Sequence, residues 1–157
     1  MISIGDNSRI DDFCAVSGEI YIGSNVHITV HCSITASLSP IFIGDFVGIA
    51  AGCHIFSSMD DFSGKTLTNP TVPMKYKEVQ HGTVRIDKHS IIGASSVVFP
   101  SVTIGEGCAI GAMSLVNKST DPWGIYVGIP VRKLKDRSKD MIKLEELYSY
   151  EVNKTQN

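Results

Sequence analysis

Apolar β-branched residues recur every six positions along most of the chain. The repeat runs in three stretches, broken by a short dislocation at residues 37–40 and by a longer gap at 56–83. The repeat positions, all Ile or Val, are Ile4, Ile10, Val16, Ile22, Ile28, Ile34, Ile43, Ile49, Ile55, Ile86, Ile92, Val98, Ile104, Ile110 and Val116. A period of six fits neither an α-helix nor alternating strands joined by hairpins, so an ordinary β-sandwich is not favoured.

Small residues follow each repeat position at fixed offsets. The fourth residue after it is usually small or aliphatic, and the residue directly after it is often Gly or Asp. This spacing is typical of a short strand and a turn, with the β-branched residue pointing inward onto its equivalent in the next coil. The Gly and Asp residues are expected to adopt turn dihedrals. The sequence therefore predicts an all-β fold, a parallel β-helix of about five coils.

The interruptions and the end of the repeat define the remaining organisation. Residues 56–83 show no helix pattern, and a stretch of this kind inside a compact domain is usually functional or disordered. Residues 138–152 place apolar side chains on one helical face, which predicts a short amphipathic helix packed on the prism or on a neighbouring subunit. We expect a β-helix domain over 1–135 with an extruded loop at 56–83. The C-terminal helix and a disordered tail from residue 153 would occupy 136–157.

Composition narrows the class of protein. Fourteen Lys and Arg against sixteen Asp and Glu leave a net charge of −2, so nucleic acid is not an expected partner. No apolar run approaches the roughly 20 residues that span a bilayer, and the N-terminal MISIGDNSRIDD lacks a secretory pattern. We therefore expect a cytoplasmic protein without membrane insertion. The four cysteines show no metal-binding spacing and all occupy the small fourth position, which indicates a structural role.

The segment IIGASSVVFPSVTIGEGCAIGAMSLVNKSTDPWGIYVGIPVRKL, together with the repeat, resembles the hexapeptide-repeat acyltransferases. This family includes maltose and galactoside O-acetyltransferases and sugar-nucleotide acetyltransferases, and the resemblance covers about residues 2–135. It implies a left-handed parallel β-helix, acetyl-CoA as cosubstrate and a homotrimer with active sites between neighbouring prisms.

The resemblance also implies a cofactor site. It places Gly93, Ala94, Gly111 and Ala112 along the pantetheine channel, although these small residues could equally serve the turns. Trp123 and Tyr126 could cover the adenine or pack the chain exit. The basic residues expected near the CoA phosphates, or otherwise on a solvated face, are Lys118, Arg132, Lys133 and Lys135.

The sequence offers several candidates for the catalytic base. Maltose- and galactoside-type relatives use a His where this chain has Asp60. Asp60 or Asp61 could act as base, since adjacent carboxylates raise one another's pKa. His81 at the far end of the loop and His54 at its mouth are further candidates, and an amine delivered unprotonated would need no strong base. A solvated loop turn would also account for the two carboxylates.

A metal site is not expected. His27, His31 and Cys32 invite comparison with γ-class carbonic anhydrases, but the two histidines fall at different positions of the repeat, so their side chains should diverge. The His-x4-His arrangement of that class is also absent.

The resemblance implies an acetyl-CoA-dependent acetyltransferase acting on a sugar or sugar nucleotide. O-acetylation in surface-polysaccharide synthesis is the favoured reaction, with direct attack on the thioester across a subunit interface. The alternatives are a sugar-nucleotide N-acetyltransferase, a γ-class carbonic anhydrase-like metalloenzyme and a non-catalytic β-helix assembly protein.

Overall fold

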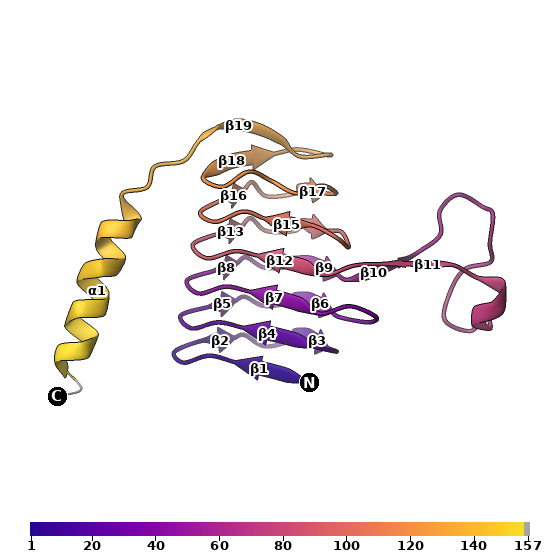
Figure 1. Ribbon diagram of the computed structural model, residues 1–157, viewed down its shortest axis with the longest axis horizontal. Helices are drawn as coiled ribbons and strands as arrows, with labels where there is room; N and C mark the ends of the chain where they lie inside the picture. Colours follow the sequence, from indigo (N-terminus) through magenta and orange to yellow (C-terminus); the bar gives the residue numbers. More distant parts are fainter. Residues whose placement is uncertain (156–157) are drawn as a thin grey trace.

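The computed structural model describes residues 1–155 and shows a three-sided prism of stacked coils (Figure 1). Each coil adds one strand to each of three parallel sheets, which we call faces A, B and C. Face A contains β1 (Ile2–Ile4), β4 (Ile20–Ile22), β7 (Ile41–Ile43), β12 (Val84–Ile86) and β15 (Thr103–Ile104). Face B contains β2 (Arg9–Ile10), β5 (His27–Ile28), β8 (Gly48–Ile49), β13 (Ile91–Ile92), β16 (Ala109–Ile110) and β18 (Gly124–Val127), with β19 (Arg132–Asp136) added antiparallel. Face C contains β3 (Ala15–Ser17), β6 (Ser33–Thr35), β9 (His54–Phe56), β14 (Val97–Val98) and β17 (Leu115–Val116). The predicted parallel β-helix is confirmed.

The repeat residues form the core of the prism. They pair in register from coil to coil, so that Ile22 lies between Ile4 and Ile43. Ile28 and Ile34 are fully buried, whereas Ile4 is 51% exposed because its coil has a neighbour on one side only. Burying such a side chain contributes roughly 1.5–3 kcal/mol. The six-residue period is thus the spacing at which each face receives one inward side chain per coil.

The small fourth position ties successive coils together. Ser8 Oγ donates to the carbonyl of Gly23 at 2.8 Å, and Ser96 Oγ donates to that of Gly111 at 3.1 Å. Cysteines occupy the same position, and Cys53 Sγ donates to the carbonyl of Gly93 at 3.2 Å. Burial raises the pKa of the Cys32 thiol to about 11, so it stays protonated and unreactive near neutrality. The structural role expected of the cysteines is confirmed.

The glycines directly after the repeat residues are not required for their turn dihedrals, and this prediction was wrong. Left-handed backbone occurs two residues later, for example at Phe13 and His31, rather than at Gly5 or Gly93. A Cβ on Gly93 would lie 2.4 Å from the backbone nitrogen of Ala112 in the next coil. Glycine is therefore required there because the coils approach closely at the corner, not because of its own dihedral angles.

The interruption at 56–83 is ordered and projects from the prism as an arm, by which we mean residues 58–81 (Figure 1). Its stem is an antiparallel ribbon of β10 (Ser58–Asp60) and β11 (Val79–His81), and its tip contains the 3-10 turn η1 (Met74–Tyr76). The period fails here because the chain leaves the prism and then resumes the same stack.

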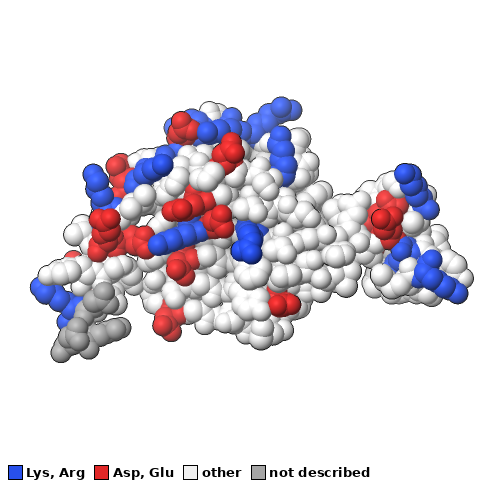
Figure 2. Space-filling model, in the orientation of Figure 1, with Lys and Arg blue, Asp and Glu red and all other residues white. Residues whose placement is uncertain are grey.

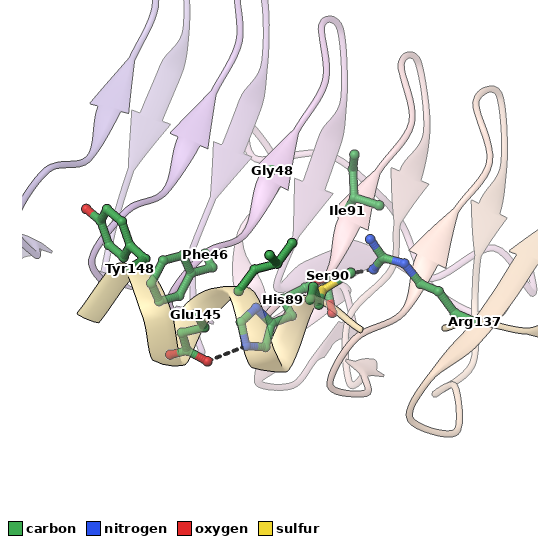
Figure 3. A pocket seen from close by; sticks show the side chains of 10 residues that line it. Phe46, Gly48, His89, Ser90, Ile91, Arg137, Glu145 and Tyr148 are labelled. Carbon is green, nitrogen blue, oxygen red and sulfur yellow. Dashed lines mark hydrogen bonds and ion pairs between the residues drawn. The ribbon is translucent and has the colours of Figure 1, made fainter. Parts of the chain in front are cut away.

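The expected C-terminal helix is α1 (Met141–Thr155), which packs on its own prism. Glu145 Oε2 lies 2.8 Å from His89 Nε2, an interaction marked in Figure 3. Lys88 Nζ contacts the same carboxylate at 2.6 Å. Burial would raise the pKa of Glu145, but hydrogen bonds from Lys88 and His89 outweigh it and lower the pKa. Tyr148 adds a hydroxyl hydrogen bond to Asn25 at 3.0 Å.

The helix runs further than predicted. We expected a disordered tail from residue 153, yet α1 continues to Thr155, while residues 156 and 157 lie outside the described part of the chain. No helix within residues 1–155 is long and apolar enough to cross a membrane.

The close approach of coils gives a stability prediction. A Cβ on Gly44 would lie 2.7 Å from the backbone nitrogen of Lys88, so Gly44→Ala should lower the free energy of unfolding by about 1–3 kcal/mol. Gly48→Ala is the matched control, because its Cβ would meet only Ile91 Cγ1, at 3.7 Å, and the variant should be as stable or slightly more stable. Urea unfolding measures both. Equal stability of the two variants would contradict this explanation of the glycines.

Candidate active site

The three edges of the prism carry different structures. Edge AB, where face A turns into face B, is covered by α1, which contacts Asn25, Phe46 and His89. The arm leaves from edge CA, between β9 and β12. Edge BC carries small residues at its centre, and a Cβ on Gly52 there would meet only Ser95 Oγ, at 3.5 Å.

The residues predicted to line the pantetheine channel lie together on edge BC. Gly93 and Ala94 occupy one coil, and Gly111 and Ala112 occupy the next. The two turns are joined by a hydrogen bond from the Met113 nitrogen to the Ala94 carbonyl at 2.8 Å. Gly93 and Gly111 already have a structural reason to be small, since a Cβ on Gly111 would lie 2.8 Å from Val127 Cγ1. Their role toward a cofactor therefore stays a prediction.

Three of the four predicted cations meet at the C-terminal end of the prism. Lys118, Arg132 and Lys133 line one hollow there with Tyr126 and Asp121. Figure 2 shows Lys and Arg gathered over this end. Lys133 Nζ contacts Asp136 at 2.7 Å, and the hydrogen bond and charge of that carboxylate raise the pKa of Lys133.

The fourth cation does not line this hollow, and of the two aromatic residues of the chain exit only Tyr126 does. Lys135 lies opposite Ile125 on β19, and it is not among the residues that line the hollow. Tyr126 is buried, and its hydroxyl accepts a hydrogen bond from the Asp121 nitrogen at 2.9 Å. Trp123 covers Gly107 in the coil below. Both aromatic residues thus make packing contacts at the chain exit, and a role in covering the adenine stays a prediction.

The stem of the arm brings two base candidates onto one face of a ribbon. Ser58 pairs with His81, and Asp60 pairs with Val79. Residues two apart on a strand share a face, so Asp60 lies on the same face as Ser58 and His81. Asp60 and His81 are therefore diagonal neighbours across the ribbon, with a typical distance between the two positions of about 7–8 Å. His81 Nδ1 is 3.0 Å from Ser39 Oγ, while Asp60 Oδ2 accepts a hydrogen bond from the Asn69 nitrogen at 3.0 Å.

The other two candidates are placed differently. The Asp61 carboxylate accepts hydrogen bonds from the nitrogens and hydroxyls of Ser63 and Thr66, at 2.8–3.3 Å. These bonds, above all that from the Ser63 nitrogen, lower the pKa of Asp61, which organises the tip of the arm. The pKa rise expected of the adjacent pair does not occur at Asp61. His54 lies on face C, with its ring stacked on Phe56 at 6.0 Å.

Two base candidates, Asp60 and His81, thus lie on a different edge from the predicted cofactor residues of the same chain. Edge BC holds the small residues, while Asp60 and His81 belong to the arm on edge CA. A single prism therefore does not bring Asp60 or His81 to these residues, whereas His54 begins β9 directly after edge BC.

The sequence prediction also overlooked a cluster on the first two coils. Arg9, Asp11 and His27 contact one another on face B, and the Phe13 and His31 rings stack on edge BC at 5.3 Å. The expected divergence of His27 and His31 is confirmed. Each stacked pair is separated by 18 residues, one coil, and this was the available signal. Among residues 1–155, no group of three or more His, Cys, Asp or Glu is arranged to hold a metal ion.

Known proteins match this architecture along almost the whole chain, although no protein-family model matches it. The chain is 42% identical over 150 residues to a dTDP-4-amino-4,6-dideoxy-D-glucose acyltransferase of Escherichia coli, covering 94% of this chain and 78% of the relative. The crystal structure of AntD, an N-acyltransferase from Bacillus cereus, in complex with dTDP and 3-hydroxybutyryl-CoA, superposes with a TM-score of 0.92. Its sequence identity is 46%, over 97% of this chain and 81% of AntD. An AntD variant in complex with dTDP-4-amino-4,6-dideoxyglucose and coenzyme A superposes with a TM-score of 0.94. Its sequence identity is 47%, over 96% of this chain and 80% of the variant.

The chain belongs to the hexapeptide-repeat acyltransferase family, and it is an acyltransferase. The family resemblance and the enzyme class predicted from the sequence are confirmed. Of these relatives, the E. coli protein is named for a nucleotide-linked amino sugar, and AntD is described as an N-acyltransferase.

The hydrogen bonds of Asp61 give a prediction about the arm. Asp61→Asn should speed hydrogen exchange at the Ser63 and Thr66 amides several-fold, because a neutral amide accepts more weakly than a carboxylate. The pKa of Asp61 is lowered, so its carboxylate is fully ionised above the ordinary pKa and accepts these bonds there. The bonds are lost as pH falls through the lowered pKa. Asp60→Asn is the matched control and should affect only the Asn69 amide. If exchange at the Ser63 and Thr66 amides rises no more than at the other amides of the arm, a structural role for Asp61 is refuted.

Proposed function

We propose that this enzyme transfers an acyl group from an acyl-CoA to the amino group of a nucleotide-linked amino sugar. The observation that carries the proposal is 42% identity across 94% of the chain, arm included, to an enzyme named for such an acceptor. N-transfer is preferred to the O-transfer favoured from the sequence, because AntD is described as an N-acyltransferase. A place in surface-polysaccharide synthesis stays a prediction. A cytoplasmic location also stays one, and the four free thiols suit a reducing compartment.

The cofactor would run along edge BC. Ala94 and Ala112 would let the pantetheine lie close to the prism wall, and Lys118 and Arg132 would meet the phosphates at the C-terminal end. Lys133 is already partly neutralised by Asp136, so its contribution would be smaller. Acetyl is the expected acyl group. A 3-hydroxyacyl group is the second candidate, because AntD was solved with 3-hydroxybutyryl-CoA.

A homotrimer would complete the site. The arm exposes Phe62, Leu67, Met74 and Tyr76, and Phe62 is 83% exposed. Side chains of this kind on a projecting segment are typical of a protein contact. A head-to-tail contact between the arm of one copy and edge BC of the next would form a ring if the rotation between copies closes after three. This arrangement would bring Asp60 and His81 of one copy to the cofactor of another.

The reaction would be a direct acyl transfer. The acceptor nitrogen attacks the thioester carbonyl carbon, a carbon–nitrogen bond forms, and the carbon–sulfur bond breaks. The amine proton passes to a base on the arm, and the CoA sulfur leaves and takes up a proton. Asp60 is the preferred base, because Asn69 engages only one of its carboxylate oxygens and Asp61 is committed to the arm. General base catalysis of this kind contributes about 10²–10⁴-fold.

Thiol release tests the proposed function. With acetyl-CoA or 3-hydroxybutyryl-CoA, we expect saturable CoA release on addition of dTDP-4-amino-4,6-dideoxyglucose. We expect none with maltose or a galactoside, whose hydroxyls are poorer nucleophiles for a site built around an amine. Release with the hydroxyl sugars and none with the amino sugar would overturn the choice of N-transfer.

The pH–rate profile of the same assay separates the base candidates. Asp60→Asn should lower kcat by about 10²–10⁴-fold and remove the acid limb, since the amide cannot accept the proton. His81→Asn should keep that limb. Gln80→Ala, on the opposite face of the same ribbon, is the control and should retain the parental profile. Loss of the limb in His81→Asn alone would assign the base to His81.

A further inference from the structure

An exposed aromatic stack stands at the N-terminal end of edge BC. Phe13 and His31 follow their repeat residues by the same offset, and both have left-handed backbone, which directs their side chains outward. Their rings lie 5.3 Å apart at an interplanar angle of 13°. Phe13 belongs to the first coil and is 80% exposed, so one face of its ring meets His31 and the other is open.

A charged group lies beside this stack on face B. Arg9 Nε is 2.8 Å from Asp11 Oδ1, and His27 Nε2 is 3.0 Å from Asp11 Oδ2. Arg9 Nη2 also lies 3.0 Å from His27 Nε2. The Arg9 side chain is 70% exposed and that of Asp11 only 19%, so the carboxylate sits behind the guanidinium and orients it.

A shallow hollow opens directly above this group. It is lined by His27, Thr29, Gly48, Ala50 and Ile91. His27 pairs with Gly48 in the next coil, where the absence of a side chain leaves room for about a methyl group before Ile91 Cγ1, which a Cβ would meet at 3.7 Å. The hollow is thus bounded by an imidazole and a hydroxyl on one side and by an apolar side chain on the other.

These three features form one track along the prism axis. Coils follow at about 4.8 Å, so the free face of Phe13, the Arg9–His27 group and the hollow succeed one another from the first coil to the third and fourth. The small residues of edge BC continue the same direction in the fourth and fifth coils. Two substrates entering from opposite ends would meet near Ala50 and Gly52.

We propose that the first two coils bind the nucleoside diphosphate of the acceptor. The base stacks on the open face of Phe13, Arg9 and His27 contact the diphosphate, and the sugar lies in the hollow beside Gly48. This assignment rests on the proposed function, and it names binding residues that the family resemblance did not supply. An aromatic face suits any base, and a guanidinium suits phosphate oxygens.

The adenine and phosphates of CoA offer the same chemistry, so the test must separate the two nucleotides. Calorimetric titration of the purified oligomer with dTDP and, separately, with CoA does this. Phe13→Ala should weaken dTDP binding about tenfold, because it removes one base–aromatic stack. Arg9→Gln should weaken it to a similar degree through the loss of a phosphate contact. Neither variant should change CoA binding.

Matched controls exclude general effects of lost surface area or charge. Tyr150→Ala removes an exposed ring on α1, and Arg85→Gln removes an exposed guanidinium on face A. Both should bind dTDP like the parent. Parental dTDP affinity in Phe13→Ala and Arg9→Gln would overturn the assignment and leave the proposed function standing. A selective loss of CoA binding would overturn it in favour of the cofactor. Failure of the parent to bind either nucleotide would contradict the proposed function itself.

Discussion

The stacking of β-branched side chains inside the prism is the constraint on which the rest of the structure depends. Each inward Ile or Val needs a partner directly above and below, so every coil must keep the register of its neighbours. That register also aligns the outward positions into columns along the axis. A residue 18 positions further on stands over its equivalent, which is how Phe13 meets His31 and Arg9 meets His27. The core thereby determines the surface.

The three edges of the prism carry different structures. Edge AB is covered by α1, which is held by Glu145 and Tyr148, and edge CA carries the arm. Edge BC combines small residues at its centre with an aromatic stack at one end, and a hollow lined by cations lies at the C-terminal end of the prism. The arm supplies Asp60 and His81 but exposes apolar side chains. Because edge BC and the arm lie on different edges of the prism, the proposed chemistry, with Asp60 or His81 as base, depends on a second copy.

The core could be predicted from the sequence because a single rule, one inward residue in six, generates it. The rule does not extend to residues that leave the prism. The ribbon of the arm and the role of Asp61 depend on hydrogen bonds within an aperiodic segment, which no spacing reveals. The glycines after the repeat residues were wrongly predicted to serve turn dihedrals. Close contact between coils and an unusual dihedral angle both favour glycine, so the residue type alone does not distinguish them. The stacked pairs on the first two coils were readable from their one-coil separation.

Activity of mixed oligomers tests most directly whether two chains build each site. One variant, Asp60→Asn with His81→Asn, disables the arm, and another, Ala112→Trp, blocks edge BC. Each alone should be inactive. Co-expressed with two affinity tags and purified as mixed trimers, they should regain about a third of parental activity, because each mixed trimer contains one contact between an intact arm and an intact edge BC. Mixed oligomers as inactive as either variant alone would show that the site is built within one chain and would contradict this account.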